Sequence, residues 1–465
     1  MNRITVAWSL LLVMSLTLLI GCSNSNSPAS LDAKNINLIF VASPDLAYQA
    51  LGDIAPDTAN LTSQGLNRSL MMATYLKQQV LGGNNVTRIY ALSPMTHLQT
   101  SNNYPDMTSI GYIQQFALLN QETLPIDTTP NGATYTANSY PLNVSYPSKG
   151  SLPGGVVEQK SGYSVKSSGL DFNNSGGIND TLVSRIIDNK TAGYHVFSAP
   201  WETIRDLLTN TNTRNGYNLN LPSKYMGPNY VYVISIPLSG SARLVTYNSN
   251  LNPPTTYPQP PSPVPSAACT HSLQSEFRAT RTGGVDGVTV PANSNKNQTI
   301  YIVRHAEAHP DATFKFENGN FVAAGQWRAL DLPNALRGKM TPQAVYSIDP
   351  AQWFPAPMSK KEVSYVRPSL TVLPYAIANN LPYYLVSSFL LFDDSAARFA
   401  SNFFFTGGKF SDQTVLLAWE SQSIMPLIKA LLDSYGGSNL PTLPVAWLGD
   451  DYNTCLLYTS DAADE

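Results

Sequence analysis

Charged side chains are scarce in this chain of 465 residues. Lys, Arg, Asp and Glu together make up 13% of it, and the formal net charge is −3. In an average soluble protein about a quarter of the residues are charged. Because the 28 basic residues form no block, a nucleic-acid partner has little support. A surface that is polar but weakly charged is typical of an exported protein.

Cysteine is rarer still, with three residues in the whole chain. Apart from Cys22, which is discussed below, only Cys269 and Cys455 are present, and they give no disulfide framework. The sequence also lacks H-E-x-x-H, C-x-x-C and Walker motifs. Four histidines show no metal-ligand spacing to carboxylates or cysteines: His97, His195, His271 and His309. We therefore expect neither a metal nor a cofactor.

The first 22 residues predict export. Arg3 supplies a charged start, residues 6–20 form an apolar run, and Leu-Ile-Gly-Cys ends at Cys22. This pattern resembles a bacterial lipobox, which implies cleavage before Cys22, lipidation of that residue and anchoring at the cell envelope. By the same analogy, Ser23 favours the outer membrane. The alternative is a transmembrane anchor, but the run is shorter than the roughly 20 residues that a spanning helix needs.

Two segments of biased composition divide the chain. Residues 23–35 are rich in Ser and Asn, as expected for a tether. Residues 251–298 begin with a proline-rich run, which cannot sustain a helix or a central strand, and then continue without periodicity. We therefore predict folded domains at 36–250 and 299–454. Within the first domain, residues 124–182 are rich in Gly, Ser, Asn and Pro and are predicted to form surface loops.

The last eleven residues, from Cys455 to Glu465, read CLLYTSDAADE. This string looks like a translated sequencing-library adapter, so we leave it out of the predicted fold. The alternative is an ordinary polar tail. Amplification of the locus from source DNA distinguishes the two.

The two halves of the chain resemble each other. Each opens with an apolar, β-branched run of the kind that forms buried parallel strands, Ile36–Ala42 and Thr299–Arg304. A helix is predicted near Gly65 and near Gly325. The later segments match in pairs: strands at 88–94 and 344–350, then strand–helix units at 193–208 and 413–431. This alternation predicts an α/β fold with two three-layer α/β/α domains and mainly parallel sheets, which we interpret as a tandem duplication.

The strongest local motif is Arg304-His305-Ala306-Glu307, at the end of a predicted strand. Ligands of open α/β sheets bind at the carboxyl ends of the strands, so an Arg-His pair there is placed for function. The alternative is a strand-end histidine that is hydrogen-bonded in a turn. Further on, Arg367 begins a predicted helix, and Pro368 suits its first turn.

Together these features resemble the histidine phosphatase, or phosphoglycerate-mutase-like, superfamily. The resemblance covers most of residues 299–454. It implies that His305 attacks phosphorus and becomes phosphohistidine, and that Arg304 and Arg367 bind the phosphate. The implied ligand is a phosphorylated small molecule or phosphate. A transferring phosphoryl group spreads its charge over three oxygens, so two guanidinium groups and a histidine meet much of the chemical need.

The sequence departs from the family at the end of the fourth predicted strand. One branch of the family has a Trp-Glu-His triplet there, whereas this chain has Trp419-Glu420-Ser421. Ser421 therefore stands where the family's second active-site histidine binds the phosphate. Loss of one such donor typically costs about 100- to 1,000-fold in rate. Glu420 and Glu307 are both candidate proton donors to the leaving group.

The first half lacks the motif altogether. By the repeat alignment, Ala42 and Ser43 replace the Arg-His pair, Asp106 stands near the second arginine, and Ala199-Pro200-Trp201 stands near the Trp-Glu-Ser triplet. We expect this half to be degenerate and inactive. Two hypotheses for the whole chain follow. It is a phosphomonoester hydrolase that acts through His305, or it is a pseudophosphatase that serves as a binding or scaffold module.

Overall fold

The fold described here is that of a computed structural model. It describes residues 28, 30–98, 104–119, 142–143, 169–257, 272–279, 288–308, 319–320, 323–350, 353–355, 362–386, 394–438, 440, 442–447, 449 and 451–460. The predicted leader with Cys22 lies outside these residues, as do Cys269, His271 and His309. So does most of the predicted loop region at 124–182.

The first domain is built on a six-stranded sheet with the order β5-β4-β6-β1-β7-β8. The strands β5, β4, β6 and β1 are parallel, and β7 and β8 are antiparallel additions at one edge. The strands are β1 (Ile36–Ala42), β4 (Arg88–Ala91), β5 (Leu142–Asn143), β6 (Gly193–Ala199), β7 (Tyr230–Ile236) and β8 (Arg243–Asn248). The helices are α1 (Ser63–Tyr75), α2 (Thr108–Leu119), α3 (Ile178–Asp188) and α4 (Trp201–Asn215), and α1 continues into the π-helix η2 (Leu76–Val80).

The second domain has a six-stranded sheet with the order β15-β12-β16-β11-β18-β9. Its strands are β9 (Ser272–Ala279), β11 (Gln298–Arg304), β12 (Ala344–Ile348), β15 (Tyr383–Val386), β16 (Thr414–Trp419) and β18 (Thr454–Ser460). Its helices are α5 (Ala323–Ala335), α6 (Arg367–Ala378), α7 (Asp394–Phe405) and α8 (Ser421–Ser434). Three two-stranded pairs complete the described part of the chain: β2 (Ile54–Ala55) with β3 (Asn60–Leu61), β10 (Val288–Thr289) with β17 (Gly436–Gly437), and β13 (Trp353–Pro355) with β14 (Glu362–Ser364).

The two domains share one strand order over five positions. In the first domain, β1 lies between the parallel strand β6 and the antiparallel strand β7. In the second domain, β11 lies in the same way between the parallel strand β16 and the antiparallel strand β18. The predicted α/β class and mainly parallel strands are therefore confirmed. The internal repeat inferred from the sequence is present as a repeated topology.

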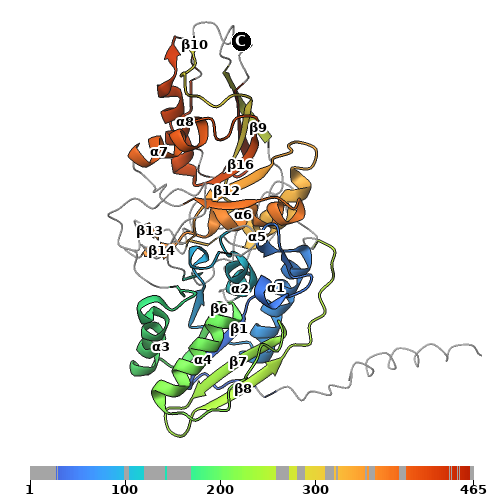
Figure 1. The fold of residues 1–465 in the computed structure, drawn as a ribbon, viewed down its shortest axis with the longest axis vertical. Helices are drawn as coiled ribbons and strands as arrows, with labels where there is room; N and C mark the ends of the chain where they lie inside the picture. The colour runs from blue at the N-terminus through green and yellow to red at the C-terminus, as the bar shows by residue number, and fades with distance from the viewer. Residues whose placement is uncertain are drawn as a thin grey trace, which may run out of the picture.

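The layers of the two domains are stacked on each other (Figure 1). Helices α3 and α4 cover the outer face of the first sheet, and α7 and α8 cover the outer face of the second. Helices α1, α2, α5 and α6 lie between the sheets. One apolar cluster runs through this inner layer and contains side chains from both domains, such as Phe116 of α2 and Leu373 of α6. The domains therefore share a core instead of being joined only by a linker.

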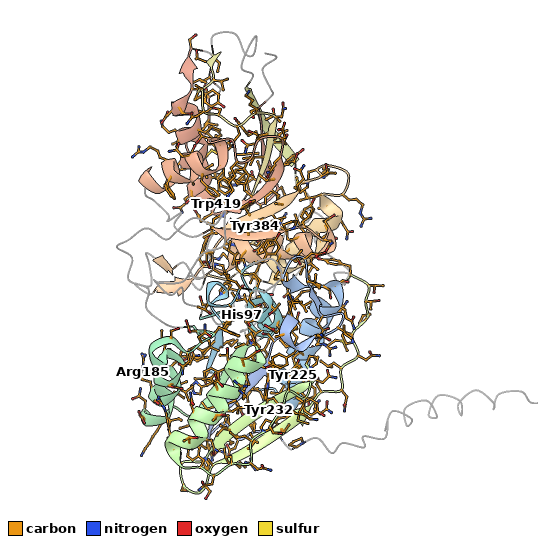
Figure 2. All side chains as sticks on the ribbon, in the orientation of Figure 1. His97, Arg185, Tyr225, Tyr232, Tyr384 and Trp419 are labelled. Atoms are coloured by element: carbon orange, nitrogen blue, oxygen red, sulfur yellow. The ribbon has the colours of Figure 1, made fainter. Side chains whose placement is uncertain are left out.

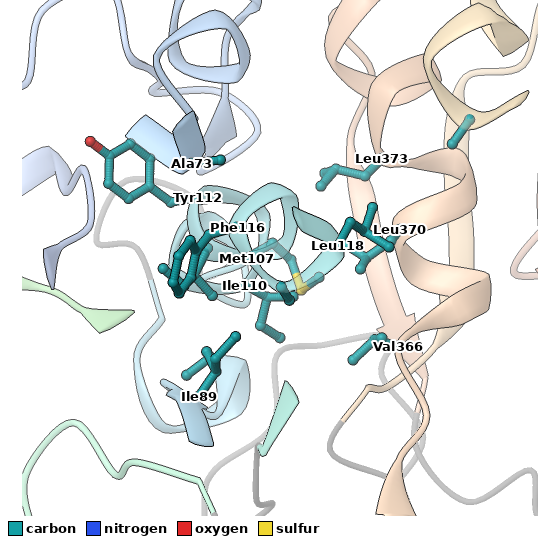
Figure 3. Close-up of a cluster of buried hydrophobic side chains, with 14 of the residues drawn as sticks. Ala73, Ile89, Met107, Ile110, Tyr112, Phe116, Leu118, Val366, Leu370 and Leu373 are labelled. Carbon is teal, nitrogen blue, oxygen red and sulfur yellow. The ribbon is translucent and has the colours of Figure 1, made fainter. Parts of the chain in front are cut away.

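Side chains of helices α2 and α6 face each other across the boundary between the domains (Figure 3). Leu118 of α2 lies toward Leu370 of α6 in this view. A Cβ atom on Gly111 would lie 3.1 Å from a side-chain carbon of Leu61 and 3.3 Å from one of Leu373. Glycine at this position therefore allows α2 to approach α6 closely.

Three segments differ from the sequence-based boundaries. Leu31, predicted to lie in the tether, is buried in the inner core. Strand β9 lies in the segment predicted to be irregular, and it pairs with β18 of the second domain. Residues 455–460, which were excluded from the predicted fold, form most of β18 and pair with β11 in the middle of the sheet. The boundary at Thr454 is thus wrong for this structure, while the origin of the last eleven codons stays a prediction.

Helix starts follow from local side-chain chemistry. Thr62 caps α1 by accepting a hydrogen bond from the backbone N–H of Gly65. Pro368 occupies the first turn of α6, where its missing N–H costs nothing. Glu420 caps α8 by accepting hydrogen bonds from the backbone N–H groups of Gln422 and Ser423.

A buried arginine is repeated in the two inner layers. In α1, Arg68 donates to Asp53 at 2.8 Å and to Asn229, just before β7, at 2.6 Å. In α5, Arg328 donates to Glu307 at 2.6 Å and to Asn453, just before β18, at 2.9 Å. In each domain this arginine ties the first inner helix to the start of the antiparallel strand.

We predict that Glu307→Gln lowers the free energy of unfolding by about 3 kcal/mol, because removing one charge of a buried pair leaves the other uncompensated. Arg328 is 3% exposed and Glu307 14%, and two nitrogens of the guanidinium contact the carboxylate. Urea denaturation followed by circular dichroism measures the loss.

The matched control for this prediction is Asp206→Asn, which removes the partner of Arg205 in a pair whose side chains are each 50% exposed. It is expected to cost less than about 1 kcal/mol. Equal losses in the two variants would show that the Arg328 pair has no special role in stability.

Candidate functional site

The Arg-His motif lies at the carboxyl end of β11, next to the end of β16. The backbone N–H of His305 donates to the carbonyl oxygen of Trp419, the last residue of β16 and labelled in Figure 2. The backbone N–H of Ala306 donates to Oγ1 of Thr371 in α6 at 2.8 Å. Two parallel strands and the first turns of α6 therefore fix the chain on both sides of His305, as the sequence predicts.

One hydrogen bond sets the tautomer of His305. Its Nδ1 lies 2.7 Å from the carbonyl oxygen of Ala306. Because a carbonyl oxygen can only accept, Nδ1 carries the proton in the neutral ring. The lone pair is then on Nε2, which is the nitrogen that a nucleophilic histidine uses in this arrangement.

Arg304 is held against a tyrosine and two backbone carbonyls. Its Nη1 donates to the carbonyl oxygens of Gly449 at 2.6 Å and Asp451 at 3.2 Å. Its guanidinium carbon lies 4.0 Å from the centre of the Tyr452 ring. This cation–π contact orients the guanidinium group beside the histidine.

Arg367 is the first residue of α6, as predicted. Its Nε donates to the carbonyl oxygen of Asn320 at 2.6 Å. Its guanidinium carbon lies 5.5 Å from the centre of the Tyr365 ring. A second tyrosine thus positions the second arginine.

Tyr365 shows that the predicted site residues come together. Its ring meets that of His305 edge-on, with centroids 6.1 Å apart. Burial raises the pKa of Tyr365 well above its usual range, the charge of Glu420 adds to the rise, and the charges of Arg367 and Arg304 oppose it. Tyr365 therefore contacts His305 and Arg367 and lies within electrostatic range of Arg304 and Glu420.

The site is enclosed. Arg304 is 5% exposed, His305 2%, Arg367 6% and Glu420 6%. Tyr452 covers one side of His305, with ring centroids 6.3 Å apart. These side chains are therefore largely shielded from bulk water. Neither Tyr365 nor Tyr452 was predicted to be a site residue.

Ser421 and Glu420 interact with each other. The hydroxyl of Ser421 donates to Oε1 of Glu420 at 3.0 Å, while Oε2 accepts from the backbone N–H of Gln422 at 2.6 Å. Burial raises the pKa of Glu420, although these hydrogen bonds and the charge of Arg304 oppose the rise. A carboxyl group that holds its proton more tightly than usual suits a proton donor.

Glu307, the other candidate proton donor, is bound in the Arg328 ion pair. Three hydrogen bonds of 2.6–2.9 Å join the two side chains. These contacts place Glu307 in an ion pair that joins the end of β11 to α5.

The matching position in the first domain is occupied by other groups. Ser43 follows β1 and its N–H donates to the carbonyl oxygen of Ala199, as the repeat alignment predicts. However, two carboxylates lie near His97, and the sequence spacing did not predict them. Its Nε2 lies 2.6 Å from Asp45 Oδ2 and 3.9 Å from Asp106 Oδ2, and among the described residues these three side chains form a group that could hold a metal ion. The ligands are far apart in sequence, so their spacing gave no warning.

The pKa values of two residues in this cluster, Asp106 and His97, are raised. Burial raises the pKa of Asp106 to about 6, against the opposing charge of His97. Burial disfavours the charged form of His97, but the hydrogen bond to Asp45 and the charge of Asp106 raise its pKa overall. By contrast, burial lowers the pKa of His195, whose Nε2 contacts the carbonyl oxygen of Thr191.

Comparison with known proteins provides no assignment. No family model matches the chain, and no curated protein matches it either. None of the helices in the described residues combines the length and apolar composition needed to cross a bilayer.

We predict a pH-dependent difference in stability between the parent and Glu420→Gln, which keeps an acceptor for the helix cap. The raised pKa means that the folded state holds this proton more tightly than the unfolded state does. The contribution of protonated Glu420 to the free energy of unfolding is therefore fully present below the ordinary pKa of 4.5. It is lost as the pH rises through the raised pKa of the folded state. The free energy of unfolding of the parent should fall relative to that of Glu420→Gln over this interval.

Urea denaturation from about pH 4 to pH 8 measures this difference. Asp433→Asn removes an exposed carboxylate from the same helix and is the control. If the difference in free energy of unfolding between the parent and Glu420→Gln is the same at every pH, the pKa of Glu420 is not raised.

Proposed function

We propose that the second domain is a histidine-phosphatase-like domain that hydrolyses phosphomonoesters through a phosphohistidine at His305. The observation that supports this most is the arrangement of Arg304, His305 and Arg367 around Tyr365 and Tyr452, with the Nδ1 proton of His305 held by a backbone carbonyl. A neutral histidine with its lone pair on Nε2 and two fixed guanidinium groups is the donor set that phosphoryl transfer requires.

The reaction would take place in two steps. In the first, Nε2 of His305 forms a bond to phosphorus while the ester P–O bond breaks, and Glu420 gives its proton to the leaving oxygen. In the second, water attacks the phosphohistidine, Glu420 takes back a proton, and inorganic phosphate leaves. Arg304 and Arg367 would neutralise the charge on the equatorial oxygens. No metal or cofactor enters either step.

The alternative is a pseudophosphatase that binds a ligand or scaffolds a partner without turnover. Two observations favour it. Ser421 stands in place of the second histidine, and its hydroxyl is bonded to Glu420. The four principal site residues are each at most 6% exposed. In either case we propose a lipoprotein anchored at the cell envelope through Cys22, on the basis of the lipobox-like sequence alone.

We predict that the chain starting at Ser23 hydrolyses p-nitrophenyl phosphate and that His305→Ala abolishes this activity. Arg367→Ala should lower the rate by about 100- to 1,000-fold, because it removes one preorganised donor to the phosphoryl oxygens. Acid-labile, base-stable labelling of the parent by a radioactive phosphate ester, absent in His305→Ala, identifies phosphohistidine.

His195→Ala is the control, because His195 is a buried histidine of the first domain, away from the motif. It should keep the parent rate. An inactive parent that gains activity in Ser421→His would identify the pseudophosphatase instead. Activity that persists in His305→Ala would contradict both readings of the site.

A further inference from the structure

The first domain carries an unassigned cluster where the second domain has its Arg-His motif. Asp45 follows β1 two residues after Ser43, the counterpart of His305, and His97, labelled in Figure 2, follows β4. Asp106 lies just before α2. All three therefore gather at the carboxyl end of the parallel sheet, which is where open α/β sheets bind ligands.

We propose that Asp45, His97 and Asp106 bind one divalent transition-metal cation, with Zn²⁺ as the probe. Their ligand atoms all lie within 4.8 Å of one another. In a tetrahedral zinc site, bonds of roughly 2.0–2.2 Å place the ligand atoms about 3.4 Å apart. Nε2 of His97 lies 2.6 Å from Oδ2 of Asp45 and 3.9 Å from Oδ2 of Asp106, so one distance is shorter and the other longer than this value.

Each carboxylate has one oxygen fixed by the backbone and the other directed at His97. Asp45 Oδ1 accepts from the N–H of Ala47 at 2.7 Å, and Asp106 Oδ1 accepts from the N–H of Thr108 at 2.9 Å. In each case Oδ2 is the atom nearest the histidine. Such outer hydrogen bonds orient metal ligands before the ion arrives.

Asp106 provides the observation that points to a missing ligand. Its side chain is 0% exposed, and no donor among the described residues reaches Oδ2 within hydrogen-bond distance. A buried carboxylate oxygen without a donor is costly, and a cation in front of it removes that cost. The oxygen lies 3.9 Å from His97, on the side where the ion would sit.

The surroundings favour a cation of this class. The His97 ring is stacked on Phe172, with centroids 3.8 Å apart, which fixes its orientation. Glu202, at the start of α4, adds negative charge that acts on both His97 and Asp45. Two carboxylates and a neutral imidazole balance the charge of a divalent ion, and the nitrogen ligand favours zinc over magnesium or calcium.

The matching position of the second domain has two arginines. The same place in the fold would therefore select an anion in the second domain and a cation in the first.

Zinc titration of the chelator-stripped chain from Ser23, by calorimetry, tests this proposal. We expect saturable binding of one Zn²⁺ per chain. Asp106→Asn, which keeps the shape of the side chain, and His97→Gln should each weaken binding by more than roughly tenfold. His195→Gln and Asp206→Asn, which remove a histidine and a carboxylate elsewhere in the same domain, should leave the affinity unchanged.

Co²⁺ added to the parent chain gives a second measurement that does not depend on the variants folding. A tetrahedral site with nitrogen and oxygen ligands should give visible absorption bands that Zn²⁺ removes. Absence of saturable zinc binding, absence of these bands, or zinc binding that survives both Asp106→Asn and His97→Gln would overturn the proposal. None of these results depends on whether His305 is catalytic.

Discussion

The inner helices α2 and α6 are buried on all sides, and the rest of the structure depends on this constraint. Every residue from Arg367 to Ala376 is buried, and so are residues 108–118. A helix that is apolar all round cannot face water, so each domain needs the other to cover it. The two sheets are therefore held on either side of one shared layer. We infer that the first domain is retained because the second requires its helices, whatever chemistry it performs.

This arrangement also positions both candidate sites. Helices α2 and α6 begin beside the carboxyl ends of the central strands, so each helix start faces the residues that follow β1 or β11. At this end of the sheet the second domain has Arg304, His305 and Arg367, whereas the first domain has Asp45, His97 and Asp106. The backbone scaffold is the same while the charge is reversed. Under the two proposals above, the ligand would differ between the domains while the packing stays the same.

The sequence predicted those parts of the structure that depend on local pattern. The apolar runs at β1, β6, β11 and β16 mark buried strands, and the Arg-His motif falls where a strand end places it. Contacts between distant residues were not predictable. His97 meets Asp45 and Asp106 only because β1, β4 and α2 converge in space. The pair of Arg328 and Glu307 was not predicted, because the two residues lie 21 positions apart and no local pattern marks their contact. Tyr365 and Tyr452 resembled ordinary core tyrosines, because nothing local marks their contact with His305.

Arg304, His305 and Arg367 are proposed to form one anion site. This proposal is tested most directly by a crystal structure of the chain from Ser23 grown with vanadate, which mimics a transferring phosphoryl group. We expect vanadium bonded to Nε2 of His305, with its oxygens within hydrogen-bond distance of both guanidinium groups. An anion bound elsewhere, or a closed site with Tyr452 still over His305 at saturating vanadate, would contradict the account.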